Sequence, residues 1–166
     1  SFTYPNGTKA LRNINLKVES GEFIALMGTT GSGKTSLLKM IKKALRPHGK
    51  LDGSILYEGS EIDSLSDRKM AGDIGYVLQN PEYQIVTDKV YHELAFGLEN
   101  LGVEKEEIRR RVGEMANYFG INSWFHKNTF DLAGGEKQVL NLAGVLVMQP
   151  SLLLLDEPTS QLDPIA

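Results

Sequence analysis

The pattern of apolar positions predicts a chain of alternating strands and helices. Short continuous apolar runs, flanked by glycine or proline, are typical of buried strands and occur at Phe23–Met27, Ile74–Leu78 and Leu152–Leu155. Apolar residues at helical spacing follow the first run, and helical patterns also occupy residues 88–118 and most of 132–148. Strand, loop and helix units of this kind indicate an α/β fold with a mainly parallel core sheet.

The N-terminal part of the chain predicts antiparallel strands instead. The turn signal Pro5-Asn6-Gly7 separates Phe2–Tyr4 from the alternating run Ile14, Leu16 and Val18. A further strand is expected at Ser54–Tyr57, between two glycines. The fold class is therefore α/β, with an N-terminal antiparallel β subdomain and a helical lobe inserted in the middle third of the chain. On that lobe, Glu106/Arg110 and Glu107/Arg111 are expected to form i,i+4 pairs.

Composition and charge exclude several classes of function. Of the 166 residues, 41% are hydrophobic and 23% are charged, as in an ordinary folded domain. A net charge of −3 gives no basic footprint for a nucleic-acid backbone. The absence of cysteine excludes disulfides, thiolate metal sites and thiol nucleophiles, and no apolar run is long enough to span a membrane.

The segment from Gly28 to Thr35 fits the pattern of a phosphate-binding loop: Gly, four residues, then Gly-Lys-Thr. Backbone N–H groups of such a loop and of the following helix point at phosphates, and side chains at the glycine positions would block the approach. Lys34 would reach the outer phosphates, and the Thr35 hydroxyl would bind Mg²⁺. The required strand before the loop and helix after it are both predicted, so we expect nucleotide binding.

Two acidic residues follow the last predicted strand. Asp156 and Glu157 come directly after Leu152–Leu155, and ligands of such sheets bind outside the carboxyl ends of the strands. One carboxylate there can hold Mg²⁺, and the next can orient or deprotonate an attacking water. Alone, the pair would indicate ordinary turn residues, but together with the phosphate loop it predicts a nucleotide-hydrolysing site.

A family resemblance rests on further motifs. Leu132-Ala133-Gly134-Gly135-Glu136-Lys137-Gln138, followed by Asp156-Glu157-Pro158-Thr159-Ser160-Gln161-Leu162-Asp163, resembles the signature motif, Walker B motif and D-loop of ATP-binding-cassette (ABC) ATPases. Gln79 resembles the Q-loop glutamine of the family, and Tyr4 lies where its adenine-stacking aromatic lies. The resemblance covers essentially the whole chain. It implies a P-loop fold, with residues 1–79 and 149–166 as catalytic core and 80–148 as helical subdomain of one nucleotide-binding domain.

The resemblance also implies ligands and site residues. The ligands would be ATP and Mg²⁺, with hydrolysis of ATP to ADP and phosphate, and two chains would dimerise head to tail around two ATPs. The implied catalytic residues are Lys34, Gln79 and Glu157. The nucleotide would be held by Tyr4, Gly28, Thr29, Thr30, Gly31, Ser32, Gly33, Lys34, Thr35 and Ser36, and across the dimer by Ala133, Gly134, Gly135 and Asp163. The implied Mg²⁺ ligands are Thr35, Gln79 and Asp156.

Three departures from the family pattern have consequences. Ala133 replaces the usual signature serine, so a hydroxyl donor to the γ-phosphate is missing and the composite site formed with the partner's phosphate loop is expected to be weaker. Val139 replaces an arginine that is common after the signature, and nothing in the sequence explains it. The chain ends at Ala166, before the family's switch histidine, so we expect a trimmed protein that is weak or inactive alone.

The stretch from Gln79 to Ile85 and then Tyr91 to Asn100 resembles the ATPase subunits of energy-coupling-factor importers and the related cobalt/nickel uptake systems. The expected partners are a second ABC ATPase chain, a transmembrane coupling subunit and a substrate-binding membrane subunit, without nucleic acid. The location implied is peripheral, on the cytoplasmic face of the membrane, and the function is uptake of a micronutrient. Ala133 slightly favours a heterodimer, because an asymmetric dimer tolerates one weak site.

Three other kinds of protein share part of the pattern. A soluble ABC ATPase of DNA maintenance is disfavoured, because the stretch between Gln79 and Leu132 is too short for a long coiled-coil arm and cysteine for a zinc module is absent. A translation factor would carry two cassettes and stays open as an alternative without a membrane partner. A P-loop kinase would not account for Leu132–Gln138.

Overall fold

A computed structural model describes residues 1–160 of the chain. The chain divides into two compact units, Ser1–Ser66 and the part that begins at Asp67, and each is described by itself. The α/β class is confirmed, since the chain combines a parallel strand pair, antiparallel strands and helices. The expected division into a core and an inserted helical subdomain stays a prediction.

The first unit contains an N-terminal antiparallel hairpin, but its second strand is Lys9–Leu11 and not the expected run Ile14, Leu16 and Val18. Strand β1 (Phe2–Thr3) pairs antiparallel with β2 (Lys9–Leu11) and, on its other edge, with β3 (Lys50–Leu51). Helix α1 (Lys34–Ile41) buries Met40 against Phe2 and Leu11 of this sheet. The remaining elements are β4 (Leu56–Tyr57) and β5 (Ser60–Glu61), which form a second hairpin, and the 3₁₀ turns Lys43–Leu45 and Ile62–Ser64.

Two strands predicted in this unit are absent. The run Phe23–Met27 forms no strand, and the side chains of Phe23 and Met27 are 91% and 90% exposed. The alternating segment around Leu16 is likewise exposed and irregular. A buried parallel strand needs neighbours that satisfy its backbone groups. No strand of the described residues pairs with either segment, because β1, β2 and β3 pair with one another.

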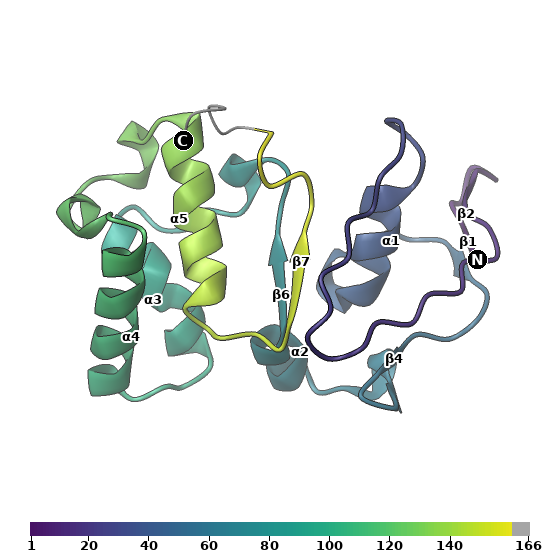
Figure 1. Ribbon diagram of the computed structural model, residues 1–166, viewed down its shortest axis with the longest axis horizontal. Helices are drawn as coiled ribbons and strands as arrows, with labels where there is room; N and C mark the ends of the chain where they lie inside the picture. The colour runs from purple at the N-terminus through teal and green to yellow at the C-terminus, as the bar shows by residue number, and fades with distance from the viewer. Residues whose placement is uncertain (161–166) are drawn as a thin grey trace. The chain divides into compact units, whose positions relative to one another are not determined.

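The second unit is built on two parallel strands and the helices packed against them (Figure 1). Strand β6 (Ile74–Val77) is fully buried, whereas the predicted last strand, β7 (Leu152–Leu155), buries Leu154 and leaves its other residues partly buried. The register aligns Val77 with Leu155. The helices are α2 (Asp67–Asp73), α3 (Val90–Asn100), α4 (Lys105–Tyr118) and α5 (Gly134–Leu146), with 3₁₀ turns η3 (Pro81–Tyr83), Asn122–Trp124 and Thr129–Asp131.

The apolar stripes of α3, α4 and α5 meet in one core. Leu94 and Leu98 of α3, Val112 of α4 and Leu140 of α5 are fully buried there. Helices α3 and α4 keep their other faces in solvent, as the amphipathic pattern predicts, whereas α5 is buried or partly buried along almost its whole length. In the described part of the chain, no helix has the length and apolarity that crossing a membrane requires.

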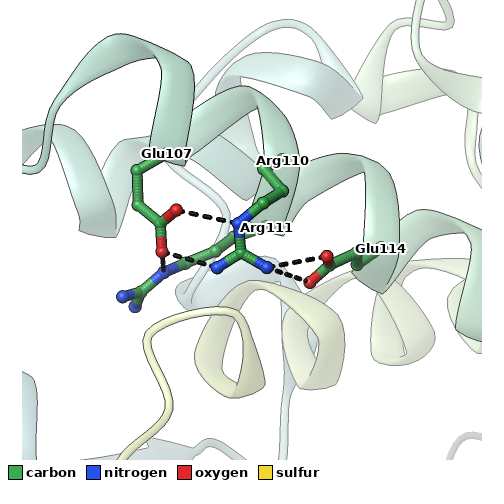
Figure 2. Close-up of polar contacts among 4 residues, drawn as sticks. All are labelled: Glu107, Arg110, Arg111 and Glu114. Carbon is green, nitrogen blue, oxygen red and sulfur yellow. Dashed lines mark hydrogen bonds and ion pairs between the residues drawn. The ribbon is translucent and has the colours of Figure 1, made fainter.

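The exposed face of α4 carries a chain of ion pairs that differs from the predicted one (Figure 2). The Glu107 carboxylate accepts hydrogen bonds from Arg110 and, at 2.6 Å, from Arg111. Arg110 also binds Glu114, so the expected Glu106/Arg110 pair does not form, while Glu107/Arg111 does. One guanidinium can reach both i−3 and i+4, and Arg110 binds two carboxylates in this way.

Candidate nucleotide site

The phosphate-loop segment has the backbone that its glycines predict. Helix α1 begins at Lys34, and its N-cap Gly33 has a left-handed backbone with φ of +95°. A Cβ at Gly33 would lie 2.7 Å from the carbonyl oxygen of Ala10, and one at Gly28 would lie 2.8 Å from Ser32 Oγ. The backbone contact excludes a side chain at Gly33, whereas at Gly28 the Ser32 side chain would have to rotate away; the first amides of α1 face the exposed loop.

Two side chains in this unit lie against the phosphate loop and its helix. Lys34 Nζ donates to the carbonyl oxygens of Gly28 and Thr29, at 2.8 and 3.1 Å. The Tyr4 hydroxyl shares a 2.9 Å hydrogen bond with Ser36 Oγ on α1. The sheet thus brings the predicted aromatic residue to the helix that follows the loop, and the lysine ammonium lies over the loop backbone.

In the second unit, the predicted residues meet where β6 and β7 end. Gln79 follows β6, and Glu157 follows β7. Because the strands are parallel and in register, their carboxyl ends lie at one edge of the pair. There Gln79 Nε2 donates a hydrogen bond of 2.7 Å to Glu157 Oε2. The structure therefore brings together two residues that lie 78 positions apart in the sequence.

The Asp156 carboxylate at the same edge is buried, with 4% of its surface exposed. Its Oδ2 accepts a 3.2 Å hydrogen bond from the hydroxyl of Tyr76, which is also buried. Burial, the neighbouring carboxylate and this hydrogen bond together raise the pKa of Tyr76 above its usual value near 10. The tyrosine therefore stays a neutral donor and orients the carboxylate from behind.

Glu157 has an unusual backbone for a glutamate. Its φ of +50° lies in the left-handed region, which costs a residue with a side chain about 1–2 kcal/mol. Its side chain is exposed and accepts from Gln79. Strained residues of this kind cluster at functional sites, where the surrounding structure holds them.

The signature segment forms the N-terminus of α5. Ala133 is the N-cap, and its backbone N–H donates to Glu136 Oε2 at 2.9 Å, which is one half of a capping box. The other half needs a side-chain acceptor at the N-cap, and alanine has none. Gly134 and Gly135 open the helix without side chains, so the amides of the first turn are sterically accessible to an anion.

Two residues that support the site were missed in the sequence. Tyr76 was expected only as part of a buried strand, and a polar group in a buried strand was the one available signal that its hydroxyl needs a partner. Nothing in the sequence around Gln84 indicates that its amide binds the backbone at the end of β6.

The remaining predicted residues lie where the motifs place them or outside the described part of the chain. Thr29, Thr30, Gly31 and Ser32 lie exposed in the loop, and Thr35 lies in the first turn of α1. Asp163 lies outside the described residues.

The chemistry of these donors suits Mg²⁺ and a nucleoside triphosphate. Asp156, Glu157 and the Gln79 amide offer hard oxygen atoms, which Mg²⁺ prefers, and a side-chain-free helix N-terminus binds phosphate. Among the residues that the structure describes, no cluster of three His, Cys, Asp or Glu side chains could hold a metal by itself. An Mg²⁺ ion would therefore need further oxygen ligands, from water or phosphate, as is usual for this ion.

Comparison with known proteins agrees with this interpretation. The family described as "ABC transporter" matches residues 11–160. A Bacillus cereus protein named as a candidate ABC transporter ATP-binding protein is 52% identical over the whole chain, which spans 30% of that protein. The energy-coupling factor transporter ATP-binding protein EcfA2 of Acetivibrio thermocellus is 40% identical over 99% of this chain and 59% of its own length.

The solved structure of cbiO1 from Clostridium perfringens, described as part of the ABC transporter complex cbiONQ, has the same fold. It superposes with a TM-score of 0.82 at 38% identity, over 98% of this chain and 64% of that one. The curated relatives are therefore longer than this chain. The P-loop fold and the resemblance to energy-coupling-factor and cobalt-system ATPases are confirmed, and the chain belongs to the ABC transporter family.

Proposed function

We propose that this chain is the ATP-binding and ATP-hydrolysing part of an importer ATPase of the energy-coupling-factor or cobalt type. The names of its relatives, EcfA2 and cbiO1, support this class of transporter. The observation that carries the proposal is the 2.7 Å hydrogen bond between Gln79 and Glu157, beside the buried Asp156. This hydrogen bond joins the segment after β6 to the segment after β7, and these segments carry the residues that hydrolysis would require.

In this proposal the first unit binds the nucleotide. Tyr4 stacks on adenine, and the loop amides together with Lys34 bind the phosphates. Lys34 would exchange its two loop carbonyls for phosphate oxygens, which are the stronger acceptors because they are charged. The phosphate-binding residues are Gly28, Thr29, Thr30, Gly31, Ser32, Gly33, Lys34, Thr35 and Ser36.

The second unit carries out hydrolysis. Glu157 accepts the proton of the attacking water, and Gln79, already hydrogen-bonded to it, fixes the carboxylate and the water in line with the γ-phosphate. Thr35, Gln79 and Asp156 would hold Mg²⁺, which neutralises developing charge on the phosphates. Tyr76 orients the Asp156 carboxylate through its hydrogen bond.

A second ABC ATPase chain would complete the site. Ala133, Gly134 and Gly135, at the N-terminus of α5, would bind the γ-phosphate held by the partner chain, and Asp163 would contact the partner. Helix N-termini attract anions because of their unpaired amides and dipole. The missing hydroxyl at Ala133 would weaken this contact, which favours a partner that is a different ATPase rather than a second copy.

The membrane partner would dock near the Gln79 segment. Tyr83 and Val86 are 81% and 63% exposed although they are apolar or largely so, and they follow Gln79 closely in the chain. Exposed apolar groups of this kind are typical of interaction sites. The occupant proposed is the transmembrane coupling subunit, with this chain on the cytoplasmic face of the membrane and a substrate-binding membrane subunit in the same complex.

Two substitutions in the full-length protein test the chemistry. Lys34→Ala should abolish ATP binding, whereas Lys39→Ala in the last turn of α1 should leave it unchanged. Glu157→Gln should bind ATP normally, lose hydrolysis and accumulate as an ATP-bound dimer in size-exclusion chromatography. Glu99→Gln, an exposed residue of α3, is the control. Hydrolysis by Glu157→Gln at the unsubstituted rate would disprove the role of Glu157 as base.

A purification tests the partners. The full-length protein, tagged and isolated from detergent-solubilised membranes, should bring along a polytopic coupling subunit, a small membrane protein and, for a heterodimer, a second ATPase. Recovery only outside the membrane fraction, with ribosomes or DNA-repair proteins, would overturn the importer and leave ATP binding intact.

A further inference from the structure

The side chain of Gln84 takes the place of a neighbouring strand. Its Oε1 accepts the Leu78 N–H at 2.9 Å, and its Nε2 donates to the Tyr76 carbonyl oxygen at 3.0 Å. Between these two residues, the Val77 carbonyl accepts from Asp156 N, toward β7. Because backbone groups alternate in direction along a strand, Tyr76 and Leu78 direct theirs to the edge of β6 away from β7. The Gln84 amide satisfies that edge.

The Gln84 side chain connects the two ends of the loop formed by residues 79–83. Leu78 directly precedes Gln79, and Gln84 follows the η3 turn, so the amide closes the segment 79–83 back onto β6. The turn itself is capped by Asn80, whose Oδ1 accepts the Glu82 N–H at 3.0 Å. The backbone on both sides of Gln79 is therefore held by side-chain hydrogen bonds.

The same loop is attached to α5. Asn141 is buried and its Nδ2 donates to the Pro81 carbonyl oxygen at 3.0 Å. Lys137, one helical turn earlier, forms a 2.9 Å ion pair with Glu82. These contacts fix the far side of the loop against a helix, while Gln84 fixes its ends against the strand.

We propose that Gln84 is a positioning residue for the Gln79–Glu157 pair: its hydrogen bonds to Tyr76 of β6 and to Leu78 directly after this strand set the direction in which the exposed Gln79 side chain leaves the backbone. This inference rests on the proposed function. A long, exposed glutamine side chain holds a 2.7 Å contact only if its backbone is fixed, and small displacements of catalytic groups reduce rates strongly.

The test uses ATP hydrolysis by the full-length protein in its complex. Gln84→Met keeps the length of the side chain and removes both hydrogen bonds. We expect kcat to fall about 10- to 100-fold while KM for ATP changes less than about twofold, because the phosphate loop is untouched. Gln84→Glu keeps the acceptor for Leu78 N–H and should be intermediate. Asn117→Met, which replaces an exposed amide of α4, should have no effect.

A double-mutant cycle separates positioning from a general structural effect. If Gln84 acts through Gln79, then adding Gln84→Met to Gln79→Ala should lower kcat little further. Hydrogen exchange gives a second readout that is independent of activity: the Leu78 amide should exchange about 3- to 10-fold faster in Gln84→Met.

Each possible result either supports or overturns the positioning role of Gln84. Non-additive loss of kcat with faster exchange at Leu78 supports it. Additive losses, a change confined to KM, or an unchanged Leu78 amide would overturn it while hydrolysis by the unsubstituted protein still supports the proposed function. If Gln84→Met does not fold, the same cycle with Gln84→Glu decides. If the unsubstituted complex neither binds nor hydrolyses ATP, the proposed function fails and this inference fails with it.

Discussion

Removing the Tyr76 hydroxyl tests the buried support of the site most directly. Tyr76→Phe keeps the ring and its burial in β6 and deletes only the hydrogen bond to Asp156 Oδ2. The substitution therefore leaves apolar packing unchanged. It removes one donor from a carboxylate that is 4% exposed.

The expected cost follows from the geometry. A hydrogen bond to a charged group contributes about 1.5–3 kcal/mol to stability. At 3.2 Å this one is longer than the usual O–H···O distance, so we expect the lower part of that range, about 1.5–2 kcal/mol. Because Tyr76 also orients a proposed Mg²⁺ ligand, the Mg²⁺ concentration needed for half-maximal hydrolysis should rise about 10-fold or more.

The assay is urea unfolding of the full-length protein, with hydrolysis measured over a series of Mg²⁺ concentrations. Tyr118→Phe is the matched control, because the Tyr118 side chain is 81% exposed at the end of α4. The control should change the free energy of unfolding by less than about 0.5 kcal/mol. Equal, small effects of the two substitutions would contradict the assignment of the Tyr76–Asp156 hydrogen bond.

The same hydrogen bond predicts how the difference in stability between Tyr76→Phe and the unsubstituted protein changes with pH. The pKa of Tyr76 is raised in the folded protein, whereas an unfolded tyrosine has a pKa of about 10. The neutral phenol is therefore favoured by folding, and its contribution is fully present below about pH 10 and is lost as the pH rises further. The Tyr76→Phe protein has no phenol to titrate at this position, so the difference in stability between the two proteins should shrink above about pH 10. A difference that stays constant there would refute the reasoning.

Substitutions at four further positions, Ala133, Glu107, Gly75 and Gly113, have defined outcomes. Ala133→Ser supplies an N-cap acceptor and should stabilise α5 by about 0.5–2 kcal/mol and strengthen ATP-dependent dimerisation, measured by analytical ultracentrifugation. The two arginine partners of Glu107 lower its pKa to about 2, so its contribution is lost as the pH falls from about 4.3 toward 2, and Glu107→Gln should flatten acid unfolding in that window. A Cβ at Gly75 would lie 2.6 Å from Val145 Cγ1, so Gly75→Ala should cost about 1–3 kcal/mol in urea unfolding, and Val145→Ala should partly restore it. Gly113→Ala, with nothing within 4 Å, should instead gain about 0.5–1 kcal/mol.

The elements that the sequence predicted correctly are those that local pattern determines. The glycine loop and α1, the buried strand Ile74–Val77 and the helices α3, α4 and α5 each carry their periodicity within one segment. The failure at Phe23–Met27 has the opposite cause. An apolar run indicates that burial is favourable, but a strand forms only beside another strand, and that partner is not encoded in the run.

The same distinction, between features set by local pattern and features set by contacts between segments, explains which parts of the site the sequence predicts. Gln79 and Glu157 each follow a predicted strand, and parallel strands end at one edge of a sheet, so position alone predicts that both lie at that edge but not that they form a hydrogen bond. The hydrogen bond from Tyr76 to Asp156 depends on side chains that meet only when β6 and β7 are in one register. No pattern within either strand indicates that register.

Gln84 shows why supporting residues are harder to predict than the residues they support. A glutamine in a turn is normally a solvated side chain, and the sequence around Gln84 gives no reason to think otherwise. Its role arises because β6 has an edge whose N–H and C=O groups need partners, and because the η3 turn returns the chain to that edge. The groups that need hydrogen-bond partners belong to the backbone at the edge of β6. Any side chain that offers both a donor and an acceptor at that point could therefore bind them. The catalytic proposal can therefore be derived from motif spacing, whereas the accuracy with which Gln79 is held depends on contacts that only the folded chain reveals.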